Sequence, residues 1–216
     1  MISSVPLLLP KIYPITDTAI SSLTHTEQVA QLLSGGATFM QLREKNNSAR
    51  SFFDDAASAV RLALDAGATI IINDRIDIAL ALGASGVHLG QTDMPVNAAR
   101  QLLGRNAIIG YSTHNVDQVR EARALPINYL AFGPIFPTRS KQNPDPVAGL
   151  DHLRAAKMLA EELPVVAIGG IDLLNLTEVF AAGADSAAII SGILSPPQNI
   201  AANLRKIILS AADQPG

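Results

Sequence analysis

The chain has 216 residues, of which 48% are hydrophobic, with no cysteine and a formal net charge of −3. This length suits one large domain, and the lack of cysteine excludes disulfides, thiolate metal sites and a cysteine nucleophile. The slightly acidic balance argues against a nucleic-acid partner, which normally needs a broad basic surface.

No segment predicts export or a membrane span. The run Leu7 to Leu9 is too short, and too poorly flanked by charge, for a signal peptide, and no apolar run approaches the length of a membrane-spanning helix. We therefore expect a cytoplasmic protein with neither a membrane nor a nucleic-acid partner.

Short apolar runs rich in β-formers alternate with helix-length segments along the whole chain. They fall at residues 12–16, 38–42, 69–73, 86–89, 107–111, 129–132, 165–168 and 186–190. Such alternation predicts parallel strands, and eight of them close into a barrel. We predict an α/β fold, a single-domain TIM (β/α)8 barrel over residues 1–216, with an N-terminal extension at 1–10 and a C-terminal tail at 210–216.

An open, doubly wound sheet is the alternative architecture. It is disfavoured by the number of repeating units and by the lack of a Gly-x-Gly-x-x-Gly motif at the first helix. Helix signals agree with the barrel: Thr24 to Glu27 forms a capping-box pattern, and Gly35, Gly67, Gly83 and Gly183 fall where helices should end.

The second predicted strand runs into a polar segment. Because side chains alternate along a strand, Met40 and Leu42 should face the helices while Gln41, Arg43 and Lys45 face the barrel interior. Charges placed there are costly unless they are paired or meet an anion. No carboxylate partner is evident, so we expect a phosphate-rich ligand to supply the negative charge.

Carboxylates follow the third and fourth strands. Asp74 comes directly after Asn73, and Asp93 lies in the loop after the next strand. In a barrel these positions converge at the C-terminal face, and two carboxylates with water and phosphate oxygens suit Mg²⁺. The alternative for Asp74 is to cap the helix near Ile76; for the next helix, Pro95 makes Met94 the expected cap.

Ser112 ends the fifth strand close to His114, but no Gly-x-Ser-x-Gly motif surrounds it, so a nucleophilic serine is not indicated. The remaining histidines are interpreted structurally, with His88 packed on its strand and His25 and His152 on helices. Their spacing does not predict a zinc site.

The longest predicted loop, residues 133–149, contains hydroxyls and cations that suit phosphate, namely Thr138, Arg139, Ser140 and Lys141. Gly169-Gly170 and Ser191-Gly192 follow the last two strands, where barrels often bind phosphate through backbone N–H groups. A merely solvated loop is the alternative. Together with the strand-two cations, these features predict two anionic sites at one barrel mouth.

Several segments in order resemble the thiamine-phosphate synthase family. They are Tyr13 to Asp17, Gln41 to Lys45, Ile72 to Asp74, Gly86 to Asp93, Gly110 to His114, Gly133 to Thr138, Gly169-Gly170 and Ile190-Ser191. The resemblance implies a TIM-barrel transferase of thiamine biosynthesis. It would join hydroxymethylpyrimidine diphosphate to a thiazole phosphate, releasing thiamine monophosphate and pyrophosphate with one Mg²⁺ per active site.

The resemblance also implies roles for individual residues. The pyrimidine diphosphate would be bound by Gln41, Leu42, Arg43, Glu44, Lys45, Asn73, Ser112 and Lys141, of which Arg43, Lys45, Ser112 and Lys141 are the catalytic candidates. The thiazole phosphate would be bound by Thr138, Arg139, Ser140, Gly170, Ile190 and Ser191, and the metal by Asp74 and Asp93. Ser140 stands where the family usually has threonine, and serine keeps the hydroxyl group.

Two alternatives remain open. A thiazole tautomerase of the same superfamily would bind thiazole phosphate without needing the metal pair or the strand-two cations. A catalytically silent barrel would bind both phosphorylated molecules without turnover. The partners are small phosphorylated substrates in each case, and the chain could act as a monomer or a homo-oligomer.

Overall fold

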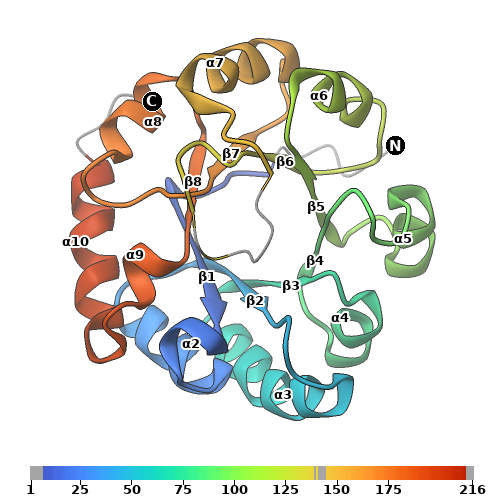
Figure 1. The fold of residues 1–216 in the computed structure, drawn as a ribbon. Coiled ribbons are helices and arrows are strands. Elements are labelled where there is room, and N and C mark those ends of the chain that lie inside the picture. Colours follow the sequence, from blue (N-terminus) through green and yellow to red (C-terminus); the bar gives the residue numbers. More distant parts are fainter. Residues whose placement is uncertain (1–6, 139, 141–144, 213–216) are drawn as a thin grey trace.

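Eight parallel strands close into a barrel, in the computed structural model that describes residues 7–138, 140 and 145–212 (Figure 1). The strands are β1 (Ile12–Asp17), β2 (Phe39–Arg43), β3 (Thr69–Asn73), β4 (Gly86–Leu89), β5 (Ile108–Thr113), β6 (Tyr129–Phe132), β7 (Val165–Ile168) and β8 (Ser186–Ile189). Each pairs with the next in the chain, and β8 pairs with β1. The predicted TIM barrel is confirmed.

Helices form a ring outside the strands (Figure 1). They are α1 (Thr18–Ser21), α2 (His25–Ser34), α3 (Ala49–Asp65), α4 (Ile76–Leu82), α5 (Val96–Leu103), α6 (Val116–Ala122), α7 (Gly149–Ala160), α8 (Leu176–Ala181), α9 (Ser191–Leu194) and α10 (Ile200–Ala212), with the short 3₁₀ helix η1 (Pro197–Asn199) before α10. The two histidines predicted to lie on helices, His25 and His152, are on α2 and α7.

Side-chain alternation divides the apolar residues into two clusters. Met40 and Leu42 are fully buried in the large cluster between strands and helices, as their positions on β2 predict. Phe39 belongs instead to a smaller cluster inside the barrel, together with Tyr13 and Tyr129. Because the interior cluster fills the lower part of the barrel, polar side chains of the same strands are left at its mouth.

Residues from the N-terminal extension close the other end of the barrel. Leu7 and Leu9 are partly buried and pack against the interior cluster, to which Phe39 and Ile71 belong. Aromatic rings fill the space above them, since Tyr13 meets Phe39 edge-on with ring centroids 4.7 Å apart. The barrel interior is therefore a packed core at its base.

The predicted capping box is present, since the Thr24 hydroxyl accepts from the Glu27 N–H while Glu27 accepts from the Thr24 N–H. The alternative reading of Asp74 as a helix cap is excluded, and the predicted cap at Met94 is wrong. Asp74 does not cap α4, whose N-cap is Arg75, and Pro95 rather than Met94 is the N-cap of α5. In both helices the cap residue makes no side-chain bond to the first turn, so local cap preference did not decide the start.

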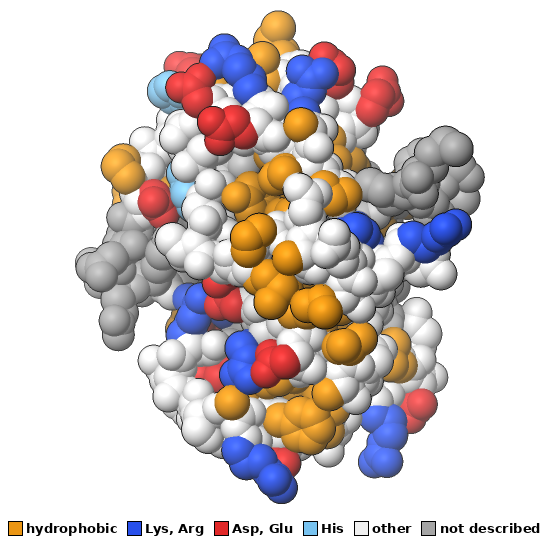
Figure 2. Space-filling view, turned by 90° about the vertical axis from the view of Figure 1, so that its right-hand side faces the viewer, with side chains coloured by type: hydrophobic (Ala, Val, Ile, Leu, Met, Phe, Trp, Pro, Cys, Tyr) orange, Lys and Arg blue, Asp and Glu red, His pale blue; other side chains and the backbone are white. Residues whose placement is uncertain are grey.

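Several charges on the outer surface occur in pairs of opposite sign. Arg75 contacts Asp77 on the α4 side, and Arg120 contacts Asp117 on α6. On the face drawn in Figure 2, most Lys and Arg side chains lie beside Asp or Glu side chains, and they do not gather into one basic area. Among the described residues, no helix is both long enough and apolar enough to cross a membrane.

Candidate active site

A cavity of about 460 Å³ opens at the C-terminal ends of the strands. This volume lies within the roughly 300–1,000 Å³ typical of small-molecule sites. Most of the predicted site residues line it, from both halves of the barrel: Gln41, Arg43, Lys45, Asn73, Asp74, Asp93, Ser112, Thr138, Ser140, Gly170, Ile190 and Ser191. Arg139 and Lys141 lie outside the described residues.

Leu42 and Glu44 are not in this cavity, because they alternate with Gln41, Arg43 and Lys45 and face the other way. Leu42 packs fully buried against the helices. Glu44 is buried behind β2, where it accepts hydrogen bonds from the Thr18 hydroxyl at 2.6 Å and the Asn46 N–H at 2.7 Å. The side chains of these two residues therefore do not fit the substrate-binding roles predicted for them.

The hydrogen bonds to Glu44 give a measurable stability effect. Burial would raise the pKa of Glu44, but the bonds from Thr18, Asn46 and Asn47 outweigh it and lower the pKa to about 2. In the unfolded chain the pKa is about 4.3, so the charged form stabilises the fold above that pH, and this contribution is lost as the pH falls toward 2.

We expect Glu44→Gln to lower the free energy of unfolding by about 1–3 kcal/mol at pH 7. The Gln amide nitrogen is a hydrogen-bond donor, and it would face the Thr18, Asn46 and Asn47 groups, which are donors themselves. The difference from wild type should shrink below about pH 4. Urea denaturation at several pH values measures it, with the exposed Glu162→Gln as control. A large rise in KM without loss of stability would instead restore Glu44 to the substrate site.

The cations facing the cavity have carboxylate partners, contrary to expectation. The Arg43 guanidinium forms an ion pair with Asp17 at the end of β1, and Lys45 Nζ lies 2.5 Å from Asp74 Oδ2. Asp17 also accepts from the Ala19 and Ile20 N–H groups, which fixes its position. Arg43 is therefore held in place before any ligand arrives, whereas the Lys45 side chain is half-exposed and contacts Asp74.

Asp74 and Asp93 meet at the mouth from neighbouring strands. Burial raises the pKa of Asp74, the adjacent Lys45 opposes this, and the Asp93 carboxylate within hydrogen-bond reach raises it further. Asp93 is anchored by the Gly90 N–H, which donates to its Oδ2 at 2.6 Å. Facing carboxylates of this kind repel each other and are well matched to a bound cation.

This pair fits Mg²⁺ better than a metal that needs a full protein cage. The part of the chain that the structure describes contains no cluster of three or more His, Cys, Asp or Glu side chains placed to hold a metal. Mg²⁺ commonly takes one or two carboxylates and completes its shell with water and substrate phosphate oxygens. Asp74 and Asp93 could supply those two ligands.

Asn73 presents an unused hydrogen-bond donor. Its side chain is only 7% exposed and lines the cavity, and its amide nitrogen has no partner among the described residues. A buried donor without a partner costs about 1–3 kcal/mol, so such groups in a cavity commonly bind ligand.

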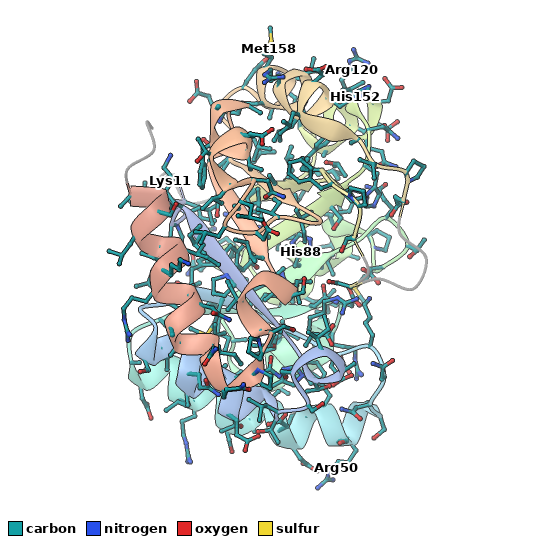
Figure 3. The ribbon with its side chains drawn as sticks, turned by 60° about the vertical axis from the view of Figure 1, so that its left-hand side comes forward. Lys11, Arg50, His88, Arg120, His152 and Met158 are labelled. Atoms are coloured by element: carbon teal, nitrogen blue, oxygen red, sulfur yellow. The ribbon has the colours of Figure 1, made fainter. Side chains whose placement is uncertain are left out.

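His88 occupies a position that the sequence interpretation missed. It lies on β4 but points into the barrel, where Figure 3 shows it at the centre while Arg50, Arg120 and His152 lie at the periphery. Its Nε2 lies 2.9 Å from the Ser112 hydroxyl and its Nδ1 lies 3.0 Å from the Tyr129 hydroxyl. Burial lowers the pKa of His88 to about 4, with Asp93 opposing and Lys45 adding to the shift, so the ring is neutral at pH 7.

The opposite side of the mouth is built from glycines and hydroxyls. Gly169 and Gly170 both have positive φ, at +100° and +65°, and the Gly170 carbonyl accepts from the Asn175 amide at 2.9 Å. The Ser140 N–H donates to the Thr138 hydroxyl at 3.3 Å, and the Ser140 carbonyl accepts from Arg43 at 3.4 Å. Arg43 thus links β2 to the loop after β6.

A closed barrel with carboxylates, cations and glycine turns at its C-terminal mouth defines a TIM-barrel enzyme suited to anionic small molecules. Residues 12–193 match the family described as thiamine monophosphate synthase. The chain belongs to this family, and is therefore a transferase of thiamine biosynthesis, as the sequence motifs predicted.

Known proteins resemble the chain over nearly its whole length. The thiamine-phosphate synthase of Koribacter versatilis is 43% identical, covering 94% of this chain and 98% of the relative. That of Methanocella arvoryzae is 42% identical over 91% of this chain and 94% of the relative. The solved thiamine phosphate pyrophosphorylase of Pyrococcus furiosus superposes with a TM-score of 0.85 at 33% identity, covering 95% and 97% of the two chains.

Proposed function

We propose that the chain condenses 4-amino-2-methyl-5-hydroxymethylpyrimidine diphosphate with a thiazole or carboxythiazole phosphate, giving thiamine monophosphate and pyrophosphate. The observation that carries the proposal is the meeting of Asp74, Asp93 and Lys45 in the cavity that also contains Gly170. A diphosphate with its cation fits the first group, and a single phosphate fits the glycine and hydroxyl side.

The diphosphate half is assigned to β2, β3 and β4. Lys45 can turn from Asp74 toward phosphate oxygens because its side chain is half-exposed. Arg43 lies beside it and is held by Asp17. Asp74 and Asp93 would hold Mg²⁺, which when bound supplies charge neutralisation on the diphosphate.

The pyrimidine ring is assigned to the interior side of the cavity. Gln41, Asn73 and Ser112 line it with amide and hydroxyl groups. Asn73 supports this assignment most directly, because its amide nitrogen is buried without a partner. These three side chains would form hydrogen bonds with a pyrimidine ring bound deeper in the cavity than the phosphates.

The thiazole phosphate is assigned to the loops after β6, β7 and β8. Thr138, Ser140 and Ser191 offer hydroxyls beside Gly170. Ile190 adds an apolar surface next to them. Arg139 and Lys141 carry roles proposed from the family resemblance only, since they lie outside the described residues.

The proposed reaction needs no protein nucleophile. The bond between the pyrimidine methylene carbon and the diphosphate oxygen breaks, its electron pair leaves with pyrophosphate, and the thiazole nitrogen then bonds to the pyrimidine cation. Arg43, Lys45 and Lys141 neutralise the charge that develops on the departing oxygen. The cavity walls hold the thiazole nitrogen in line with the methylene carbon, so the second step is effectively intramolecular.

The direct test is to mix the purified protein with both substrates and Mg²⁺ and to quantify thiamine monophosphate and pyrophosphate. We expect both products in equal amounts, and none when the thiazole phosphate is omitted or Mg²⁺ is chelated. Binding of both substrates without product would favour the silent barrel. Tautomer exchange of a thiazole phosphate alone, without condensation, would favour the tautomerase.

A further inference from the structure

A continuous chain of hydrogen bonds crosses the barrel interior at the floor of the cavity, where Tyr13 and His88 also line it. Gln41 Nε2 donates to the Tyr13 hydroxyl at 2.9 Å, and the Tyr13 and Tyr129 hydroxyls are 2.9 Å apart. Tyr129 then meets His88 Nδ1 at 3.0 Å, and His88 Nε2 meets the Ser112 hydroxyl at 2.9 Å. Five strands contribute one residue each, and both ends of the chain, Gln41 and Ser112, line the cavity.

The direction of each hydrogen bond in this series follows from Gln41, whose Nε2 can only donate. The Tyr13 hydroxyl accepts from Gln41, and its own hydrogen finds an acceptor among the described residues only if it points to the Tyr129 oxygen, so we take Tyr13 as the donor to Tyr129. Tyr129 in turn must donate to His88 Nδ1. A neutral imidazole whose Nδ1 accepts carries its proton on Nε2, and that N–H donates to the Ser112 oxygen.

We propose that Tyr13, Tyr129 and His88 are positioning residues that fix the direction of hydrogen bonding at both ends of the pyrimidine subsite. With Nε2 of Gln41 committed to Tyr13, its Oε1 remains an acceptor. With the Ser112 oxygen accepting from His88, its hydroxyl hydrogen remains a donor. An acceptor and a donor match the exocyclic amine and an adjacent ring nitrogen of an aminopyrimidine, so this inference rests on the proposed function.

Packing of the surrounding rings makes this hydrogen-bond chain rigid. The His88 and Tyr129 rings are nearly parallel, with centroids 5.6 Å apart and an interplanar angle of 27°. They fit because Gly110 has no side chain: a Cβ there would lie 2.3 Å from the Tyr129 oxygen and 2.5 Å from His88 Nδ1. Tyr13 and Tyr129 are almost fully buried, and among the described residues their hydroxyls contact each other, Gln41 and His88.

The first test reads the His88 tautomer without any substrate. In protein labelled with ¹⁵N-histidine, long-range ¹H–¹⁵N spectra should show His88 with Nδ1 unprotonated and Nε2 protonated at pH 7. His88→Gln identifies the signal among the four histidines of the chain. The opposite tautomer, or a fast mixture of both, would overturn the proposed direction, whether or not the chain has synthase activity.

The second test measures specificity in Tyr129→Phe, which removes one hydroxyl and keeps the ring. Without the Tyr129 donor, the His88 proton can move to Nδ1. Nε2 then becomes an acceptor, and the Ser112 hydroxyl can donate to it instead of to the ligand. We expect the single tautomer to be lost and the KM for the pyrimidine diphosphate to rise about tenfold, the size of one hydrogen bond, while the KM for the thiazole phosphate changes less than about twofold.

Controls separate this effect from misfolding and from failure of the proposed function. Tyr111→Phe removes a hydroxyl from a half-buried tyrosine on the outer side of β5 and should leave both KM values unchanged. His88→Gln, which retains a donor and an acceptor, should bind the pyrimidine diphosphate better than His88→Leu. Equal changes in both KM values for Tyr129→Phe, with native thermal unfolding, would overturn the positioning role.

Discussion

Replacing Asp74 with asparagine is expected to reduce turnover by about 10²–10³-fold while the fold is retained, the usual size of losing one preorganised electrostatic group. Burial and the nearby Asp93 raise the pKa of Asp74, so its charge is held in the free protein at some cost that a cation would offset. Asn keeps the shape of the side chain but removes the charge.

The backbone at this position makes Asp74→Asn a clean test. Asp74 has φ +60°, a left-handed conformation that asparagine adopts more readily than most residues. The lost contact with half-exposed Lys45 contributes little to stability. Thermal unfolding should therefore be unchanged, and the loss should appear in kcat and in the Mg²⁺ concentration needed for half-maximal rate.

Asp77→Asn is the matched control, since Asp77 lies three residues further on, is exposed and forms an ion pair with Arg75 outside the cavity. It should change turnover less than about twofold, as expected for an exposed pair. If Asp74→Asn titrates with Mg²⁺ like wild type, Asp74 is not a metal ligand and the diphosphate half of the proposal needs revision.

Gly170→Ala should damage both stability and thiazole-phosphate binding. Gly170 has φ +65°, and a Cβ there would lie 2.6 Å from the Pro137 carbonyl oxygen and 2.8 Å from the Phe136 Cβ. The left-handed backbone alone costs alanine about 1–2 kcal/mol, and relief of the clash adds about 1–3 kcal/mol. Because the clash pushes on the segment that leads to Thr138, we expect the KM for the thiazole phosphate to rise at least about tenfold.

Gly67→Ala isolates the contribution of the clash. Gly67 has a similar φ of +71°, but a Cβ there meets nothing within 4 Å. It should cost only the backbone strain, about 1–2 kcal/mol, and leave both KM values unchanged. Urea denaturation and initial-rate kinetics on the two variants give the comparison; equal losses of stability would show that the contact with Pro137 is relieved without cost.

Most of the barrel was predictable because strand signals are local. The second strand shows this well: alternation alone placed Met40 and Leu42 outside and Gln41 inside, and the structure agrees. The same alternation, applied strictly, also turns Glu44 away from the cavity. The motif resemblance had assigned that residue to substrate.

Partners across the barrel were not predictable, since they depend on register and ring packing. Arg43 meets Asp17 because these residues are paired between β1 and β2, which no single-strand pattern specifies. His88 and Tyr129 come from β4 and β6, which are separated by β5, and meet only because Gly110 leaves room between them. A histidine on the inward face of its strand was the available signal.

The packed base of the barrel has a consequence for how this protein can change. Leu7, Leu9, Phe39 and Ile71 contribute to the interior cluster, yet none of them lines the cavity at the mouth. The Tyr13 and Tyr129 hydroxyls mark the boundary between the two layers. Thermal stability thus depends mainly on the base of the barrel, and substrate specificity on its mouth. Repacking the base at constant volume should therefore change thermal stability with little effect on substrate specificity.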